Sequence, residues 1–253
     1  MNTSPLRTIL YVDDDPDICE IVRVALGLTR SFTVHTAHSG EQALMLALKL
    51  RPDLVLLDVM MPGLDGPGTL TRMRADPITG LIPVIFITAK AMLKEVALLR
   101  EMGAIGVIPK PFDPLQLSTE VISFWQGLPD GSQSRDETAG HSGLHRQVTK
   151  FAERFLQRTK DETVRLRNLI ESVQPGNLSE IETVRNLAHR IRGSGSTFGF
   201  ARVSECAAEI ERLVDALKEG DAASATAVDS KLRRRLTECT QRLSREVEAA
   251  VAR

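Results

Sequence analysis

Residues 8–28, TILYVDDDPDICEIVRVALGL, decide the fold of the first half of the chain. The apolar run Thr8–Val12 predicts a buried strand, and Pro16–Leu28 then carries apolar residues at helical spacing. The same alternation recurs up to residue 126. The further predicted strands lie around residues 32–34 and at Leu54–Leu57, Val84–Ile87 and Ile105–Ile108; the further predicted helices follow Ser39, end near Ala75, and span Ala91–Met102 and Pro114–Trp125.

Five strand–helix pairs at this spacing predict an α/β domain over residues 1–126. We expect an open parallel sheet that is doubly wound, with helices on both faces. The runs LVLL at 54–57 and VIFI at 84–87 are typical of strands buried on both sides. In such sheets the binding crevice lies at the carboxyl ends of the strands, so polar residues that follow the strands are candidates for a site.

The second half is predicted to be all-helical and to follow a linker. Residues 127–143, GLPDGSQSRDETAGHSG, are polar and rich in Gly and Ser, which indicates a flexible linker. Residues 144–253 lack strand signals, so we expect a bundle of about four or five helices. The expected helices are Leu144–Thr159, Glu162–Val173, Leu178–Thr197, Ala201–Glu219 and Ala222–Val251, with breaks at Pro175-Gly176, near Gly199 and at Gly220-Asp221.

The composition argues against several functional classes. The chain of 253 residues has a net charge of −1 and lacks the concentrated basic surface of a nucleic-acid-binding protein. Its apolar runs are too short to cross a bilayer, and its first residues lack the pattern of a secretory signal. Three widely spaced cysteines argue against a disulfide framework or a metal cluster. We therefore expect a cytoplasmic protein with no nucleic-acid or membrane partner.

Chemically active side chains follow four of the predicted strands. Asp13–Asp15 follow the first strand, Asp58 the third, Thr88 the fourth and Lys110 the fifth. The parallel sheet brings them to one edge, where clustered carboxylates repel one another unless a cation lies among them. Mg²⁺ suits such oxygen ligands, and it would neutralise charge on a phosphoryl group transferred to Asp58. Thr88 and Lys110 could then contact phosphoryl oxygens.

Each of these residues also has an ordinary structural interpretation. Asp15 could cap a helix before Pro16, Asp58 could be a turn residue, and Lys110 could be a surface cation. The combination at consecutive strand ends of one sheet favours the functional interpretation over these separate ones.

The motifs YVDDD, LLDVMMPGLDG, FITAK and GAIGVIPKPF, at residues 11–15, 56–66, 86–90 and 103–112, resemble those of bacterial response-regulator receiver domains. The resemblance covers residues 6–126 and implies a flavodoxin-like fold. It implies a domain that catalyses its own Mg²⁺-dependent phosphorylation and dephosphorylation rather than an enzyme with a separate substrate. The implied residues are Asp58 as phosphoacceptor, Asp14 and Asp15 as metal-binding acids, the Met60 carbonyl as a further metal ligand, Thr88 and Lys110 as the phosphate-sensing pair, and a cis Lys110–Pro111 bond.

One position departs from the receiver pattern. Receivers often carry Tyr or Phe three residues before the lysine, where the ring relays phosphorylation to the opposite surface; this chain has Val107. The departure leaves the phosphorylation chemistry untouched and puts the aromatic relay in doubt. Ala89, directly after Thr88, is small, as is usual in receivers.

The informative segment of the second half is LAHRIRGSGSTFGF, residues 187–200. On a helical wheel, Arg192 and Gly193 fall beside His189, whereas the apolar residues fall on the opposite side. We therefore expect His189 to face outward as an exposed nucleophile, with Arg192 supplying positive charge and Gly193 opening the approach. The alternatives are a hydrogen-bonded histidine in the core and an exposed histidine without a role.

This segment resembles the signature of histidine-containing phosphotransfer (HPt) domains, with Arg192 in place of the usual lysine. The resemblance covers roughly residues 141–253 and implies that His189 is phosphorylated. We therefore expect a phosphorelay protein that exchanges phosphoryl groups through Asp58 and His189 with a histidine kinase, other receivers or other HPt proteins. The alternative is a phosphorylation-controlled binding module in which His189 is idle. The sequence does not give the oligomeric state.

Overall fold

The computed structural model describes residues 5–28, 32–89, 93–127, 141–173, 178–219 and 230–252. The chain divides into two compact units, Met1–Thr149 and Lys150–Arg253. The predicted linker lies mostly outside the described residues; its last three residues, 141–143, begin a helix. No helix in the described part of the chain combines the length and the apolar character that crossing a membrane requires.

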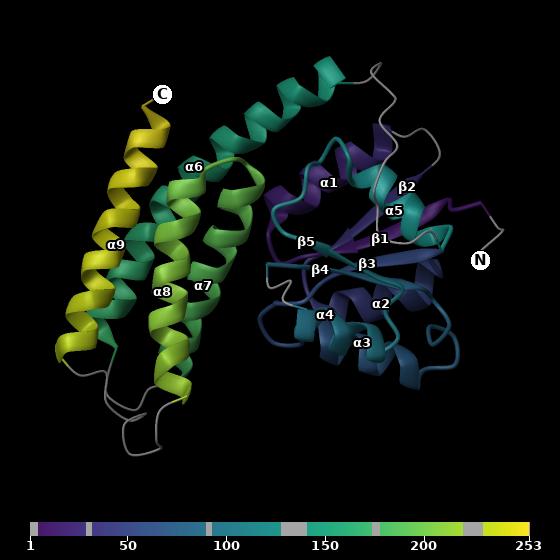
Figure 1. Cartoon of the computed structure of the whole chain (residues 1–253), viewed down its shortest axis with the longest axis horizontal. Coiled ribbons are helices and arrows are strands. Elements are labelled where there is room, and N and C mark those ends of the chain that lie inside the picture. Colours follow the sequence, from purple (N-terminus) through teal and green to yellow (C-terminus); the bar gives the residue numbers. More distant parts are fainter. Residues whose placement is uncertain are drawn as a thin grey trace. The chain divides into compact units, whose positions relative to one another are not determined.

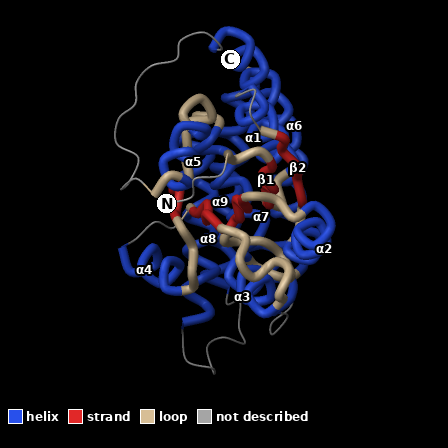
Figure 2. Tube along the Cα trace, turned by 90° about the vertical axis from the view of Figure 1, so that its right-hand side faces the viewer, coloured by secondary structure: helices blue, strands red, loops and turns tan. Residues whose placement is uncertain are grey.

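The first unit contains the predicted parallel sheet, and this prediction of the fold is confirmed. The strand order is β2-β1-β3-β4-β5, so the chain adds strands on both sides of the β1–β3 pair, and all neighbouring strands are parallel. Figure 2 draws the strands of this sheet in red. Every residue of β3 and β4 is buried, as their continuous apolar sequences require. The strands are β1 (Thr8–Val12), β2 (Thr33–Ala37), β3 (Leu54–Asp58), β4 (Val84–Thr88) and β5 (Gly106–Pro109).

Helices cover both faces of this sheet. One face carries α1 (Pro16–Leu28) and α5 (Leu117–Trp125), and the other carries α2 (Gly40–Leu50), α3 (Gly66–Ala75) and α4 (Leu93–Glu101) (Figure 1). The hydroxyl of Ser39 accepts a hydrogen bond from the Gln42 N–H and so caps α2 as predicted, and Asp65 caps α3 in the same way. The Asp65 cap fixes the loop that follows β3, and this loop borders the site described below.

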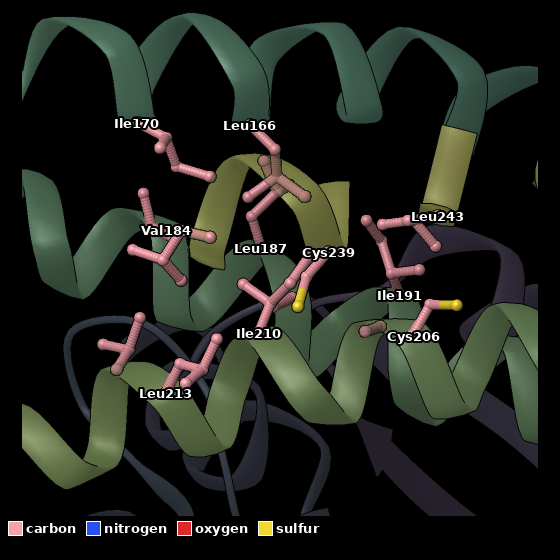
Figure 3. Close-up of a cluster of buried hydrophobic side chains, with 14 of the residues drawn as sticks. Leu166, Ile170, Val184, Leu187, Ile191, Cys206, Ile210, Leu213, Cys239 and Leu243 are labelled. Atoms are coloured by element: carbon pink, nitrogen blue, oxygen red, sulfur yellow. The ribbon is translucent and has the colours of Figure 1, made fainter. Parts of the chain in front are cut away.

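The second unit is a helical bundle, as predicted. It is built from the part of α6 (His141–Ser172) that begins at Lys150, together with α7 (Leu178–Thr197), α8 (Ala201–Glu219) and α9 (Ser230–Val251). Aliphatic side chains from all four helices meet in its core, among them Leu166, Ile191, Ile210 and Leu243 (Figure 3). Phe155 of α6 is fully buried there and packs against Phe198 and Phe200.

The structure corrects one helix boundary inside the bundle. The sequence predicts a break between Thr159 and Glu162, yet α6 runs through this region without interruption. The hydroxyls of Thr159 and Thr163 donate to the backbone carbonyls four residues earlier, both at 2.7 Å, so these polar side chains are satisfied inside the helix. Gly199, with φ of 83°, ends α7 as expected, and the predicted breaks at residues 175–176 and 220–221 lie outside the described residues.

Candidate functional site

The carboxyl ends of the central strands bring the predicted residues of the first unit together. Asp58 is the last residue of β3 and pairs in register with Ile87, one residue before Thr88 at the end of β4. Asp13 follows β1 directly, and its N–H continues the ladder to the carbonyl of Ala37. Asp13, Asp58 and Thr88 are each no more than 2% exposed. The parallel sheet therefore holds these side chains at one buried edge.

Lys110 links two of these acids. Its Nζ lies 2.8 Å from Oδ2 of Asp13 and 3.0 Å from Oδ1 of Asp58. Its backbone N–H donates to the carbonyl of Thr88 at 2.7 Å, which ties the loop after β5 to the end of β4. The Lys110–Pro111 bond is cis, as the resemblance implies. The lysine is thus an internal partner of the acids and not a surface cation.

The acids that lie closest together differ from the predicted pair. Carboxylate oxygens of Asp13, Asp14 and Asp58 all lie within 4.8 Å of one another. Asp15 instead accepts a hydrogen bond from the Asp17 N–H at 2.9 Å, in the first turn of α1. Its side chain therefore has the capping role that the sequence left open as an alternative. The geometry therefore favours Asp13 and Asp14 as the candidate metal-binding pair, in place of the predicted Asp14 and Asp15.

Asp13 is the centre of the hydrogen-bond network in this site. Its Oδ1 accepts from the Asp15 N–H at 2.9 Å, and its Oδ2 accepts from the Tyr11 hydroxyl at 2.8 Å as well as from Lys110. Tyr11 is fully buried, and burial together with the Asp13 carboxylate raises its pKa well above the ordinary value, so it stays a neutral donor. Tyr11 was missed in the sequence, although it precedes Asp13 by two residues and so lies on the same face of the strand.

The electrostatics of the cluster are dominated by burial and by like charges. Burial is the largest influence on Asp58: together with the charges of Asp13 and Asp14, and partly offset by Lys110, it raises the pKa of Asp58 to about 8. Burial alone would lower the pKa of Lys110, but the carboxylates of Asp13 and Asp58 outweigh it and raise that pKa. Lys110 therefore stays protonated, and its ammonium lies between the carboxyl groups of Asp13 and Asp58.

The donor set fits a small, hard divalent cation. The three gathered carboxylates offer oxygen ligands and carry more negative charge than Lys110 balances, which is the environment that Mg²⁺ prefers. Met60 lies in the loop two residues after Asp58, and the role of its backbone carbonyl as a further metal ligand stays a prediction.

Val107 is buried in the core beside Phe86, in the place where receivers often have an aromatic ring.

Gly66 is required by the backbone of the phosphoacceptor candidate. A Cβ at this position would lie 2.3 Å from the carbonyl oxygen of Asp58 and 2.9 Å from the Cα of Val59. Only glycine therefore lets α3 begin this close to the end of β3. The loop PGLDG, which carries this glycine and the Asp65 cap, helps to fix where Asp58 ends its strand.

In the second unit, His189 is buried, which corrects the predicted exposure. It is 6% exposed, and its Nδ1 lies 2.9 Å from Oε1 of Glu211 on α8. The helical wheel failed here because it considers α7 alone, whereas α8 presents a carboxylate to the polar side of α7. The alternative of a hydrogen-bonded histidine describes the observed state of the side chain.

Glu211 joins His189 to Arg192. Its Oε2 accepts from the Arg192 guanidinium at 2.9 Å, and Glu211 is 1% exposed. Burial would raise the pKa of Glu211, but the hydrogen bond from His189 and the charge of Arg192 outweigh it and lower the pKa to about 2. An ionised carboxylate only accepts hydrogen bonds, so Nδ1 of His189 carries the proton and Nε2 keeps its lone pair when the ring is neutral.

Glu211 was missed in the sequence, although a signal exists. It falls among Ala207, Ile210 and Val214, at the spacing of the buried stripe of α8, and an acid in such a stripe needs a partner.

Gly195 lies at the contact between α7 and α8. A Cβ on Gly195 would lie 3.4 Å from the backbone nitrogen of Ser204, which is an ordinary van der Waals distance, so the contact between the helices does not require glycine at this position. The Ser204 hydroxyl donates to the carbonyl of Arg192 at 2.7 Å and fixes this contact. Gly193 is itself buried, so the premise that it opens a path to an exposed imidazole is wrong.

Comparisons with known proteins agree with both units. The response regulator receiver domain family matches residues 9–122, and the Hpt domain family matches residues 150–249. The DNA-binding response regulator MtrA of Mycolicibacterium smegmatis is 41% identical over 115 residues, which are 46% of this chain and 49% of that protein. The DNA-binding dual master transcriptional regulator RpaA of Synechocystis is 33% identical over 149 residues, which are 58% of this chain and 60% of that protein.

This chain therefore spans about half the length of the curated relatives that it matches. Among solved structures, the chemotaxis protein CheY4 of Vibrio cholerae is 28% identical, with a TM-score of 0.44, over 47% of this chain and 98% of that chain. Together, the family matches and the fold identify this chain as a member of the two-component phosphorelay family, with a response regulator receiver domain followed by an Hpt domain.

Proposed function

We propose that the chain is a phosphorelay protein that accepts a phosphoryl group on Asp58 and carries phosphoryl groups on His189. The observation that carries the proposal is the position of Asp58. It ends a central strand, 3.0 Å from the Lys110 ammonium, and shares a cluster of carboxylate oxygens with Asp13 and Asp14. This arrangement provides a nucleophile, a cation for a phosphoryl oxygen, and acids for a metal ion at one edge of the sheet.

At Asp58 the proposed reaction is attack of a carboxylate oxygen on the phosphorus of a phosphohistidine in a partner protein. The O–P bond forms as the N–P bond breaks, and the imidazole leaves with its electron pair. Lys110 shifts from the Asp58 carboxylate to a phosphoryl oxygen, and the buried Thr88 hydroxyl can donate to another. Mg²⁺ held by Asp13, Asp14 and Asp58 would offset the negative charge of the acids and of the phosphoryl oxygens.

At His189 the proposed reaction is attack by Nε2 on the phosphorus of an aspartyl phosphate. The N–P bond forms as the O–P bond breaks, and the aspartate leaves as a carboxylate. The positive charge that the ring acquires is stabilised by Glu211 at Nδ1, and the charge of Arg192 lies one helical turn away for a phosphoryl oxygen. Because His189 is 6% exposed, the exchange requires a partner that can reach a largely buried residue.

The phosphoryl group is proposed to come from another protein. In this sequence the glycines at 193–199 lie in and just after a helix, and no glycine-rich nucleotide-binding loop follows a strand. A histidine kinase, another receiver or another HPt protein would therefore be the donor. As predicted from the sequence, we propose no nucleic-acid or membrane partner.

Radiolabel transfer from a partner kinase to the full chain tests this function. We expect base-labile, acid-labile acyl phosphate that is lost in Asp58→Asn and acid-labile, base-stable phosphohistidine that is lost in His189→Gln. Glu205→Gln, on an exposed part of α8, serves as the control. The proposal would be contradicted if Asp58→Asn still carried base-labile label as the wild type does, or if the wild type took no label.

The burial of His189 favours a second candidate function. If His189 serves as a structural partner of Glu211, the chain is a binding module that phosphorylation of Asp58 regulates. In that case His189→Gln leaves signalling intact and Asp58→Asn abolishes it. The labelling experiment separates the two functions, because the binding module yields no base-stable phosphohistidine.

A further inference from the structure

One oxygen atom in the receiver site accepts hydrogen bonds from two side chains. Oδ2 of Asp13 lies 2.8 Å from the Tyr11 hydroxyl and 2.8 Å from Nζ of Lys110. The second of these donors is shared, because Nζ also lies 3.0 Å from Oδ1 of Asp58. Asp13 is 1% exposed, so this oxygen has little access to bulk water.

The two donors differ in their freedom to move. Lys110 has a long side chain in a loop after β5. Tyr11 is fully buried on β1, a central strand, where it pairs in register with Thr36 on one side and Leu56 on the other. Tyr11 and Asp13 are two residues apart and therefore lie on the same side of the strand. The hydroxyl is consequently fixed on Asp13, whereas the ammonium can leave.

Phosphorylation of Asp58 draws the Lys110 ammonium away from Oδ2 of Asp13. The transferred group brings new anionic oxygens beyond the Asp58 carboxyl, and the ammonium can follow that charge only by giving up Oδ2 of Asp13. A buried carboxylate that loses its last side-chain donor is costly. With Tyr11 in place, Oδ2 of Asp13 keeps a side-chain donor throughout, while Oδ1 accepts from the Asp15 N–H.

We propose that Tyr11 is a positioning residue that holds the Asp13 carboxylate when Lys110 moves to the phosphoryl group on Asp58. The inference rests on the proposed phosphorylation of Asp58. Tyr11 does not touch the phosphoryl group; it acts through Asp13 by making the departure of Lys110 less unfavourable. Before phosphorylation the hydroxyl is dispensable, because Lys110 still occupies the same oxygen.

The test compares the full chain with Tyr11→Phe, which removes the hydroxyl and keeps the ring. Two quantities are measured: the Kd of Mg²⁺ by titration calorimetry, and the rate at which phosphoramidate phosphorylates Asp58 in saturating Mg²⁺. The control is Ile9→Val, a change at a fully buried residue on the same face of β1 that removes no polar contact.

We expect Tyr11→Phe to slow phosphorylation about tenfold, the order of effect of one hydrogen bond to a charged group, while the Mg²⁺ Kd stays within about twofold. Ile9→Val should change neither quantity. Equal rates in wild type and Tyr11→Phe, or a parallel loss of Mg²⁺ binding, would overturn the inference. A wild type that phosphoramidate does not label, or base-labile label that persists in Asp58→Asn, would instead overturn the proposed function.

Discussion

Nδ1 of His189 lies 2.9 Å from Oε1 of Glu211, across the contact between α7 and α8. The same carboxylate accepts from Arg192 through its other oxygen. A residue on the neighbouring helix therefore sets the protonation pattern of the imidazole and the position of the guanidinium together. The electrostatics of this carboxylate lead to the first prediction.

Glu211 should stabilise the folded chain at neutral pH and lose this effect in acid. Its pKa is about 2 in the folded state against an ordinary value of 4.5, so the folded state binds a proton less readily than the unfolded state. The contribution is complete above pH 4.5 and disappears as the pH falls toward 2. We expect Glu211→Gln to lower the free energy of unfolding by roughly 2–3 kcal/mol at pH 7.

Urea denaturation of wild type and variant between pH 7 and pH 3 measures this difference. The difference should shrink steadily below pH 4.5, whereas the exposed Glu205→Gln should show none. A difference that is constant over this range would show that lost packing, and not charge, is responsible.

Asp58 should affect the pH dependence of stability in the opposite direction to Glu211. Without a metal ion its pKa is raised from 3.8 to about 8, so between these values the folded state holds a proton that the unfolded state releases. The free energy of unfolding should therefore fall as the pH rises from 4 to 8. In EDTA at pH 8, we expect Asp58→Asn to be more stable than wild type by at least about 1 kcal/mol.

The gain in stability of Asp58→Asn over wild type should be smallest near pH 4. Thermal or urea unfolding of both proteins at pH 4 and pH 8 measures it. Adding Mg²⁺ should stabilise the wild type more than Asp58→Asn, because the ion binds the folded wild type. If Asp58→Asn is destabilising at pH 8, the electrostatic description of this site is incorrect.

The aspartates after β1 should separate into metal-binding and capping residues. Asp13→Asn and Asp14→Asn each remove a carboxylate from the gathered set, so we expect Mg²⁺ affinity to fall at least about tenfold. Asp15→Ala removes the acceptor for the Asp17 N–H and should instead cost about 1 kcal/mol of stability. Its Mg²⁺ affinity should stay within about threefold of wild type.

Calorimetric titration and urea denaturation of the three variants distinguish these effects. A loss of Mg²⁺ affinity in Asp15→Ala as large as that in Asp13→Asn would restore the assignment that the sequence suggests.

Gly66 should be essential, in contrast to Gly27. An added Cβ at Gly66 meets the carbonyl of Asp58 at 2.3 Å, so Gly66→Ala must displace the end of β3 or the start of α3. We expect a loss of stability of about 2 kcal/mol or more, with weaker Mg²⁺ binding. Gly27, in α1, has no heavy atom within 4 Å of an added Cβ, so Gly27→Ala should stabilise the chain by about 0.5 kcal/mol.

The matched pair separates crowding from helix propensity, and urea denaturation with Mg²⁺ titration measures both effects. Unchanged stability in Gly66→Ala would mean that α3 can move away from Asp58 without consequence.

The parallel sheet can be predicted from the sequence because each strand is indicated by a short run of consecutive residues. Apolar runs such as Leu54–Leu57 must be buried on both faces, and the residues that follow them must then meet at one edge. This argument places Asp58, Thr88 and Lys110 correctly without any knowledge of distances. It does not decide which of Asp13, Asp14 and Asp15 face inward, because a shift of one residue reverses the answer.

His189 shows where sequence reasoning ends. Its environment depends on Glu211, which is 22 positions away in the chain and on another helix. A wheel of one helix describes which side is apolar, but it cannot describe what a neighbouring helix brings to the polar side. The same holds for Tyr11, whose importance depends on the orientation of two other side chains around Asp13.

The placement of the receiver site on strand ends has a consequence for diversification. Asp13, Asp58 and Thr88 are held by the ladder of the central sheet, and Lys110 is tied to it through the carbonyl of Thr88. The contacts described above that hold these atoms come from the strands and from the loops that follow them. Mutations on the outer surfaces of the helices can change which protein docks without moving a reacting group, so the choice of partner and the chemistry can evolve independently.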